Sequence, residues 1–287
     1  MCINLNSNSI QIRKKGKLQG SNLLFVRCGS KLPLCLKEYF VSSDIIVVLS
    51  LYKNNDFIIH DEWWVLEGGY SKYHAAKLFL DEYKVFLNCD VFAFFDPDIS
   101  IHYNNIIWLF KSGKNEKRGI YQASLKDNAN VTWPFLKNID SSNGWRETTF
   151  VEVMAPFFSQ KALLNIYNYF DISISTWGLE YLWYYKCSDL HVGVYDNIIM
   201  SHESPVDTES GPFYMYLQKM NINPFEERES VKKKFNNINY IECDVPNLIP
   251  FKLKKYYVKL ISKKNNISLC FASVLRAVYG GLKLLKN

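Results

Sequence analysis

The sequence predicts a mixed α/β domain with a mainly parallel sheet flanked by helices. Three apolar runs, at residues 22–28 (NLLFVRC), 44–51 (DIIVVLSL) and 91–95 (VFAFF), have the length and composition of buried strands. Segments that suit helices lie between them, and strands joined by helical crossovers run parallel in one sheet. Ligands of such sheets collect at the carboxyl ends of the strands, so function is expected there.

The composition is that of a globular chain, with 48% hydrophobic and 16% aromatic residues among 287. Its seven cysteines are scattered without C-x-x-C spacing, which favours free thiols in a reducing compartment over disulfides or a zinc site. The N-terminal residues lack the apolar run of a secretory signal, and no uncharged run approaches the ~20 residues that span a bilayer. We therefore expect a cytoplasmic protein.

Charge is distributed unevenly, and the sequence divides into three parts: a polar arm (1–20), a main domain (21–230) and a basic extension (231–287). The extension has 12 Lys or Arg and two acids, whereas the first 230 residues have 22 Lys or Arg and 26 acids. Residues 252–264 (KLKKYYVKLISKK) and the largely apolar 269–285 suit an interfacial helix on an anionic membrane, here the inner face of the cytoplasmic membrane. The alternative is a solvated helical face.

Two segments of the first half are placed to meet a ligand. Gly29 and Ser30 follow the first predicted strand at its carboxyl end, and a helix is expected at 34–40. Residues 67–72 (EGGYSK) precede another helix, where a glycine pair, an N-cap serine and Lys72 could hold an anionic group.

The clearest candidate site is Asp96-Pro97-Asp98, directly after the 91–95 strand. In an extended chain the side chains of i and i+2 point the same way, roughly 6–7 Å apart, so Asp96 and Asp98 can converge on one ligand. A Mg²⁺ or Mn²⁺ ion chelated by a diphosphate fits two carboxylates. The alternative is ordinary turn chemistry, in which Asp-Pro-Asp is common.

The middle of the chain supplies aromatic and acidic candidates. A helix is expected at 104–111 and a strand at 120–124, followed by a long polar loop, 126–149, that carries Trp145 and Arg146. Indole rings in such loops suit sugar rings or bases.

Residues 150–158 (FVEVMAPFF) are expected to form another buried strand. A carboxylate in such a strand, here Glu152, is costly unless it is paired or functional, with Arg146 as the structural alternative.

The last part of the domain is predicted as two helices, a short strand and a loop. The first helix covers 159–170, and the second opens at Trp177 with Glu180 in its first turn, where the helix dipole favours an acid in any case. The strand covers 191–195, and the loop after it contains His202, a candidate metal ligand.

Four stretches together resemble the GT-A fold of nucleotide-sugar glycosyltransferases, which is Rossmann-like, and within it a bacterial and plant family of unknown function. They are EGGYSKYHAAKLFL, YKVFLNCDVFAFFDPDI, TFVEVMAPFFSQKAL, and STWGLEYLWYY followed by HVGVYDNIIMSHESPV. They span about residues 66–205, and their order is more specific than a D-x-D motif alone. The basic extension matches no family.

The resemblance implies a role for each matching residue. Asp98 would be the direct metal ligand, and Asp96 would contact the donor ribose or a metal-bound water. His202 would complete the metal shell, Lys72 would contact a donor phosphate, and Glu180 would bind the acceptor or act in catalysis. The related family has further acids beside its D-x-D where this chain has phenylalanines, which leaves the cation fewer protein ligands.

The implied reaction moves a sugar from a nucleotide-diphosphate donor, foremost a UDP-sugar, to a saccharide or lipid-linked saccharide in bacterial surface polysaccharide or lipopolysaccharide synthesis. The cation would neutralise the departing diphosphate. In an inverting mechanism Glu180, or else Glu152, would take the proton of the acceptor hydroxyl; a retaining mechanism stays open. Trp145, Arg146 and Trp177 are the expected acceptor contacts.

Three other functions compete with this interpretation. A nucleic-acid-binding protein would use the basic extension, but the body is acidic and carries no recognised nucleic-acid motif. A two-metal phosphoesterase would need more His and Asp ligands than the sequence gathers. A sugar-binding relative without activity is the third.

Overall fold

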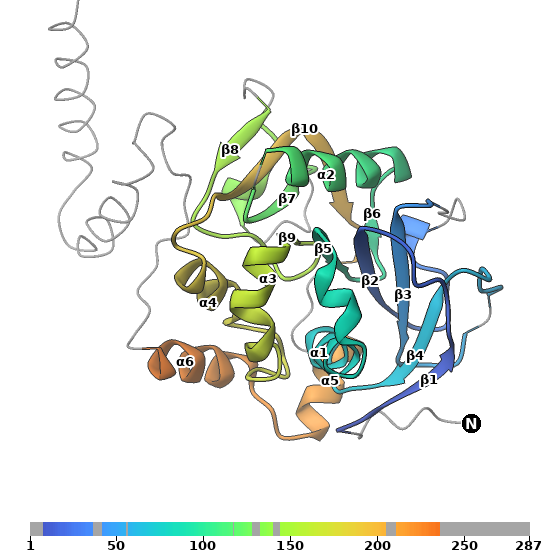
Figure 1. Cartoon of the computed structure of the whole chain (residues 1–287). Coiled ribbons are helices and arrows are strands. Elements are labelled where there is room, and N and C mark those ends of the chain that lie inside the picture. The colour runs from blue at the N-terminus through green and yellow to red at the C-terminus, as the bar shows by residue number, and fades with distance from the viewer. Residues whose placement is uncertain are drawn as a thin grey trace, which may run out of the picture.

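The computed structural model describes residues 8–36, 42–55, 57–116, 118–127, 133–139, 144–204 and 211–235. In these ranges ten strands form one sheet in the order β1-β4-β3-β2-β5-β9-β7-β10-β6, and β8 pairs with β10 (Figure 1). The strands are β1 (Ile10–Lys14), β2 (Asn22–Cys28), β3 (Ile45–Leu51), β4 (Trp64–Gly68), β5 (Val91–Phe95), β6 (Ile99–Ser100), β7 (Ile120–Leu125), β8 (Trp145–Glu147), β9 (Phe157–Ser159) and β10 (Val192–His202).

The longest ladders are parallel, as the sequence predicted. β2 runs parallel to β3 and to β5, β3 runs parallel to β4, and β7 runs parallel to β10, whereas β9 is antiparallel to both β5 and β7. Every residue of β2, β3 and β5 is buried, which is why these strands are apolar runs rather than alternating ones. The mixed α/β fold class is confirmed.

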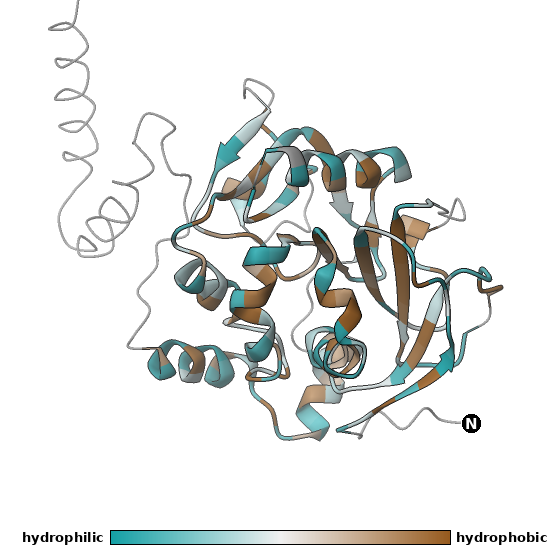
Figure 2. Cartoon of the chain, in the orientation of Figure 1, coloured by the Kyte–Doolittle hydropathy of each residue, from teal (hydrophilic) through white to brown (hydrophobic). Residues whose placement is uncertain are grey.

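Helices cover both faces of the sheet. They are α1 (Lys72–Glu82), α2 (Tyr103–Asn115), α3 (Gln160–Ile166), α4 (Leu179–Lys186), α5 (Pro212–Lys219) and α6 (Pro224–Lys234). Alternate side chains of β5 point to opposite faces, so Phe92 and Phe94 pack with α1 and α3, whereas Phe95 packs with α2. Figure 2 shows the strands of the centre coloured as the most hydrophobic part of the chain.

Several predicted elements differ from those observed. The helix expected at 34–40 is a 3₁₀ turn at Leu34–Leu36, and residues 37–41 lie outside the described part. The helix at 104–111 continues through Gly113 to Asn115. Within the polar arm, Ile10–Lys14 forms β1, an edge strand antiparallel to β4. The edge strand depends on its pairing with β4, a long-range contact that local patterns do not carry.

Two differences affect the site. The strand expected at 150–158 is wrong for its first seven residues, because the Glu152 amide donates to the Gln122 side chain, 2.7 Å away, rather than to a neighbouring strand. Conversely, the strand expected at 191–195 continues to His202, with a register shift between Tyr195 and Ile199. His202 therefore lies at the end of β10 and not in a loop.

The basic extension remains a prediction, since residues 236–287 lie outside the described part. Its first residues belong to α6, which begins at Pro224 and crosses the boundary that charge suggested at 230. Among the described helices, none has the length and apolar character needed to cross a bilayer.

Candidate functional site

Asp96, Asp98 and His202 lie together at the carboxyl ends of β5 and β10. β5 ends at Phe95, and the chain returns as β6, which pairs antiparallel with the end of β10 so that Ile99 lies opposite His202. This register brings His202 Nε2 to 3.2 Å from Asp98 Oδ2. The side chains of Asp96 and Asp98 are 34% and 24% exposed, so both remain accessible to a ligand.

The ion pair shifts the titration of both partners. Burial alone would raise the pKa of Asp98, but the hydrogen bond and charge of His202, helped by Ser204, outweigh it and lower the pKa. Burial alone would lower the pKa of His202, but Asp98 first, and then the charges of Asp96 and Glu152, raise it. Asp98 is therefore an anion, and the site around it is rich in negative charge.

Lys72 forms an ion pair with Asp96. The first residue of α1, it is buried, and its Nζ lies 2.9 Å from Asp96 Oδ1. The same ammonium donates to the backbone oxygens of Phe94 (3.2 Å), Val153 (2.7 Å) and Met154 (3.0 Å). Burial lowers the pKa of Lys72 despite the charge of Asp96. The predicted phosphate contact remains untested, but these four contacts favour a role in positioning Asp96.

Glu152 is the most perturbed acid of the site. It is 5% exposed, and among the described residues its Oε2 has no hydrogen-bond partner. Burial, together with the charges of Glu180 and Asp96 and against that of His202, raises its pKa to about 8. At neutral pH Glu152 therefore carries a proton and can donate a hydrogen bond.

Glu180 reaches the same site from α4. Its charge acts on Glu152, on the buried Tyr73 of α1 and on Tyr214 of α5, and Asp96 acts on the same two tyrosines. Four acidic residues from three separate segments, Asp96, Asp98, Glu152 and Glu180, are thus linked by charge effects on one another or on shared neighbours. Trp177, two residues before α4, donates its indole N–H to the Tyr214 hydroxyl at 3.3 Å.

Three tyrosines complete the surroundings, and the sequence analysis missed all of them. Tyr73 donates to the Val153 carbonyl at 2.6 Å, and Tyr214 receives the Trp177 indole. Tyr52 is close enough to Asp96 and Asp98 for their charges to raise the pKa of its phenol, although burial is the larger cause. No sequence signal separates these tyrosines from the other sixteen, because their position depends on packing between distant segments.

Gly29 lies beside Tyr52, and Tyr52 is close to Asp96 and Asp98. A Cβ on Gly29 would lie 2.9 Å from the Tyr52 hydroxyl, so a side chain at this position would displace the phenol. Ser30, the next residue, is partly exposed. The predicted donor contacts of Gly29 and Ser30 stay predictions.

Trp145 and Arg146 lie elsewhere. They belong to β8, which pairs with Gly193–Tyr195, at the opposite end of β10 from His202. Arg146 is 7% exposed and holds Asp196 with two hydrogen bonds of 2.9 and 3.0 Å. Its guanidinium also donates to the carbonyls of Phe135 and Lys137, so we assign Arg146 a structural role.

Trp145 is likewise engaged in packing. The Arg118 guanidinium lies 3.9 Å from the centre of its indole ring, and the Tyr195 ring crosses it at 4.9 Å. Of the three residues predicted to bind the acceptor, only Trp177 is placed with the acids.

The donor set suits a cation that arrives with phosphates. In the described ranges no group of three or more His, Cys, Asp or Glu residues is arranged to hold a metal ion unaided. Asp98 and His202 nevertheless place one carboxylate oxygen and one imidazole nitrogen 3.2 Å apart, and the nitrogen becomes a ligand when it releases its proton. Mg²⁺ and Mn²⁺ accept such sparse protein ligation when phosphate oxygens and waters supply the rest. The residues present therefore fit a cation that is shared with a diphosphate.

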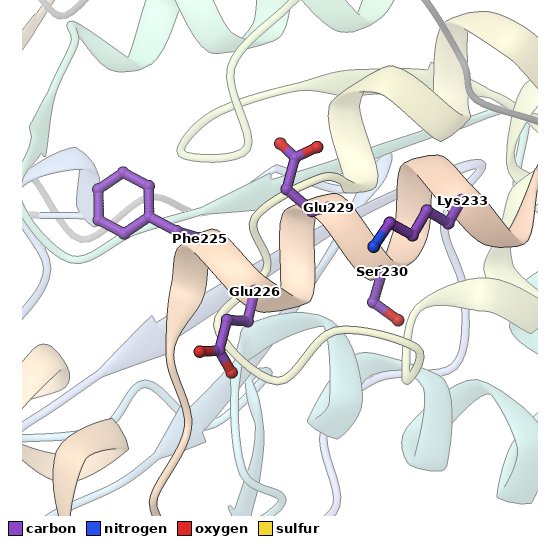
Figure 3. Close-up of a pocket in the computed structure, with 5 residues that line it drawn as sticks. All are labelled: Phe225, Glu226, Glu229, Ser230 and Lys233. Carbon is purple, nitrogen blue, oxygen red and sulfur yellow. The ribbon is translucent and has the colours of Figure 1, made fainter.

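A hollow lies along α6. It is lined by Phe225, Glu226, Glu229, Ser230 and Lys233 (Figure 3). Glu229, one of its two acids, is already paired with Lys232 at 3.3 Å and Arg228 at 3.2 Å.

The comparisons with known proteins give no family. No family model matches the chain, and no curated protein matches it. The chain is similar to the crystal structure of A197 from STIV, with 14% identity over 63% of this chain and 84% of that one, at a TM-score of 0.39. It is also similar to the structure of GalNAc-T7 with UDP, GalNAc and Mn²⁺, with 9% identity over 84% of this chain and 57% of that one, at a TM-score of 0.46. Chemistry must therefore be argued from this chain's own residues.

Proposed function

We propose that the protein is a metal-dependent glycosyltransferase that takes a sugar from a nucleotide-diphosphate donor, with UDP-sugars as the first candidates. The observation that carries the proposal is the meeting of Asp98 and His202, 3.2 Å apart, beside Asp96 at the carboxyl ends of the strands. Lys72, the buried lysine beside Asp96, is engaged by Asp96 and by backbone oxygens and so is not placed to receive phosphates. A divalent ion would supply the positive charge that a diphosphate needs.

Each acid has a separate task in this proposal. Asp98 and His202 would hold the ion, which neutralises charge on the departing diphosphate when bound. Lys72 fixes Asp96, so that one of its carboxylate oxygens faces the donor without reorganisation. Both tasks concern the leaving group.

Glu180 and Glu152 are assigned to the acceptor side, and the pKa of Glu152 distinguishes their roles. With its pKa raised to about 8, Glu152 is protonated at neutral pH and is a poor base but a good hydrogen-bond donor. Glu180 is therefore the better candidate for the base that takes the proton of the acceptor hydroxyl in an inverting transfer. Trp177, next to it, offers an aromatic face to a sugar ring.

The cellular setting follows from the sequence and not from the described residues. We propose a saccharide or lipid-linked saccharide acceptor in bacterial surface polysaccharide or lipopolysaccharide synthesis. The basic segment 252–264 would bring the protein to the anionic face of the cytoplasmic membrane. Liposome co-sedimentation of the full chain and of a chain ending at residue 235 tests this: equal binding would refute it.

Turnover of nucleotide sugars tests the central proposal. A panel of UDP-, GDP- and dTDP-sugars is screened with Mn²⁺ for a raised melting temperature, and the best donor is then assayed for release of its nucleoside diphosphate. Asp98→Asn and His202→Ala should lose at least about 10²-fold of the rate. The control Asp189→Asn removes a surface partner of Lys161 and should behave as the wild type. Donor binding without any turnover would indicate a non-catalytic sugar-binding protein instead.

A further inference from the structure

The segment that delivers Trp177 and Glu180 to the site is an elbow, Ser173–Gly178, with unusual backbone geometry. Thr176 has φ +70° and Gly178 has φ +94°, both in the left-handed region. A non-glycine residue such as Thr176, which is also β-branched, is rarely found there, and the conformation persists only where its surroundings enforce it. Something outside the elbow must therefore hold it.

The holding group is the side chain of Glu227, on α6. Glu227 Oε1 accepts the backbone N–H of Ile174 at 2.9 Å, and Oε2 accepts the backbone N–H of Ser175 at 2.7 Å. The Ser173 hydroxyl also donates to Oε2, at 3.1 Å. One carboxylate thus binds three successive residues of a segment more than fifty positions away in the chain, and bonds to a charged acceptor are the stronger kind.

The rest of α6 fits the elbow closely. A Cβ on Gly178 would lie 3.1 Å from both Arg228 Cα and Val231 Cβ, so α6 packs directly against the backbone at this residue. The Phe225 ring crosses the Trp177 indole with centroids 5.0 Å apart. The elbow is therefore packed against α6, and the Tyr214 hydroxyl accepts a hydrogen bond from the Trp177 indole N–H.

We infer that Glu227 is a positioning residue, which fixes the elbow in the one conformation that presents Trp177 and Glu180 to the acceptor. The effect on transfer rests on the proposed function, but the conformational role does not. Among the described residues, the hydrogen bonds of the Glu227 side chain all go to Ser173, Ile174 and Ser175, so we expect Glu227 to act through the elbow. Its loss should leave donor binding unchanged and slow the transfer step.

The variants are Glu227→Gln and, as a matched control, Glu226→Gln. Glu226 is the adjacent residue in the same first turn, is exposed, and makes the same interaction with the helix dipole. Hydrogen exchange of the amides of Ile174 and Ser175, followed by mass spectrometry of the full chain, measures how often their hydrogen bonds to residue 227 open. Glu227→Gln should speed exchange in this peptide at least about tenfold, and Glu226→Gln should leave it unchanged.

Steady-state kinetics measures the effect of this change on the transfer step. Misplacement of a reacting group by about 1 Å can lower a rate about 10²-fold, so Glu227→Gln should lower kcat by about that factor, with the donor KM within about twofold of wild type. Unchanged exchange in the 174–175 peptide would overturn the conformational role. Faster exchange with wild-type kcat would overturn the positioning role, while an inactive wild type with the expected exchange pattern would overturn the proposed function alone.

Discussion

Replacing Glu152 by Gln should stabilise the protein, and the gain should grow with pH. Burial raises the pKa of Glu152 in the folded protein from 4.5 to about 8. Below pH 4.5 both folded and unfolded chains are protonated, and no free energy is lost. As the pH rises further, the unfolded chain releases its proton while the folded chain keeps it, so stability falls until about pH 8. Glutamine has no proton to release.

The size of this effect follows from the shift. Each pH unit between the two pKa values changes the free energy of unfolding by about 1.4 kcal/mol, so the loss reaches on the order of 3 kcal/mol at pH 7. Urea unfolding of wild type and Glu152→Gln at pH 5, 6, 7 and 8, with EDTA present, measures the difference. We expect the advantage of the variant to rise by about 1.4 kcal/mol per unit.

The control for this series is an exposed acid on the same chain. Glu226→Gln changes the same chemical group on the surface of α6, and its difference from wild type should stay constant from pH 5 to 8. An advantage of Glu152→Gln that is also constant over this range would refute the assignment of a protonated Glu152.

Two further predictions concern the buried cations. Lys72→Met leaves the Asp96 carboxylate without its ammonium partner. Because Asp96 is about one-third exposed, we expect the free energy of unfolding in urea to fall by roughly 2–3 kcal/mol, less than for a fully buried pair. The double variant with Asp96→Asn should recover this loss. The result that contradicts this is an additive double variant. Arg146→Met should cost about 3–5 kcal/mol by stranding the buried Asp196, with Mn²⁺ affinity unchanged in calorimetry. A weakened Mn²⁺ affinity would instead place Arg146 in the site.

The sequence predicted the centre of the fold well because buried parallel strands are apolar throughout. β2 and β5 have the predicted bounds, and β3 begins one residue later than expected. The prediction that a cation-binding pair ends β5 also depends on local features, since two acids at i and i+2 after a buried strand are visible in the sequence. How far Asp98 lies from His202 is not visible there, because the strand pairing that joins them spans about a hundred residues.

The site residues that sequence reasoning placed least well are the ones with buried partners. Arg146 carries the same signal whether it faces a sugar or Asp196, and only the structure gives the ion pair. Lys72 likewise suits a phosphate or the Asp96 carboxylate. No role was predicted for Glu227, because an acid in the first turn of a surface helix is expected from the helix dipole alone. Side-chain pairing across long sequence distances is what local patterns leave out.

We propose that Asp98 and His202 bind a divalent cation together with a diphosphate. Isothermal titration of the full chain with UDP, in the presence of Mn²⁺ and again in the presence of EDTA, tests it most directly. We expect binding that needs Mn²⁺ and that weakens at least about tenfold in Asp98→Asn and in His202→Ala, but not in Asp189→Asn. UDP binding of equal strength in EDTA, or in both site variants, would contradict the claim.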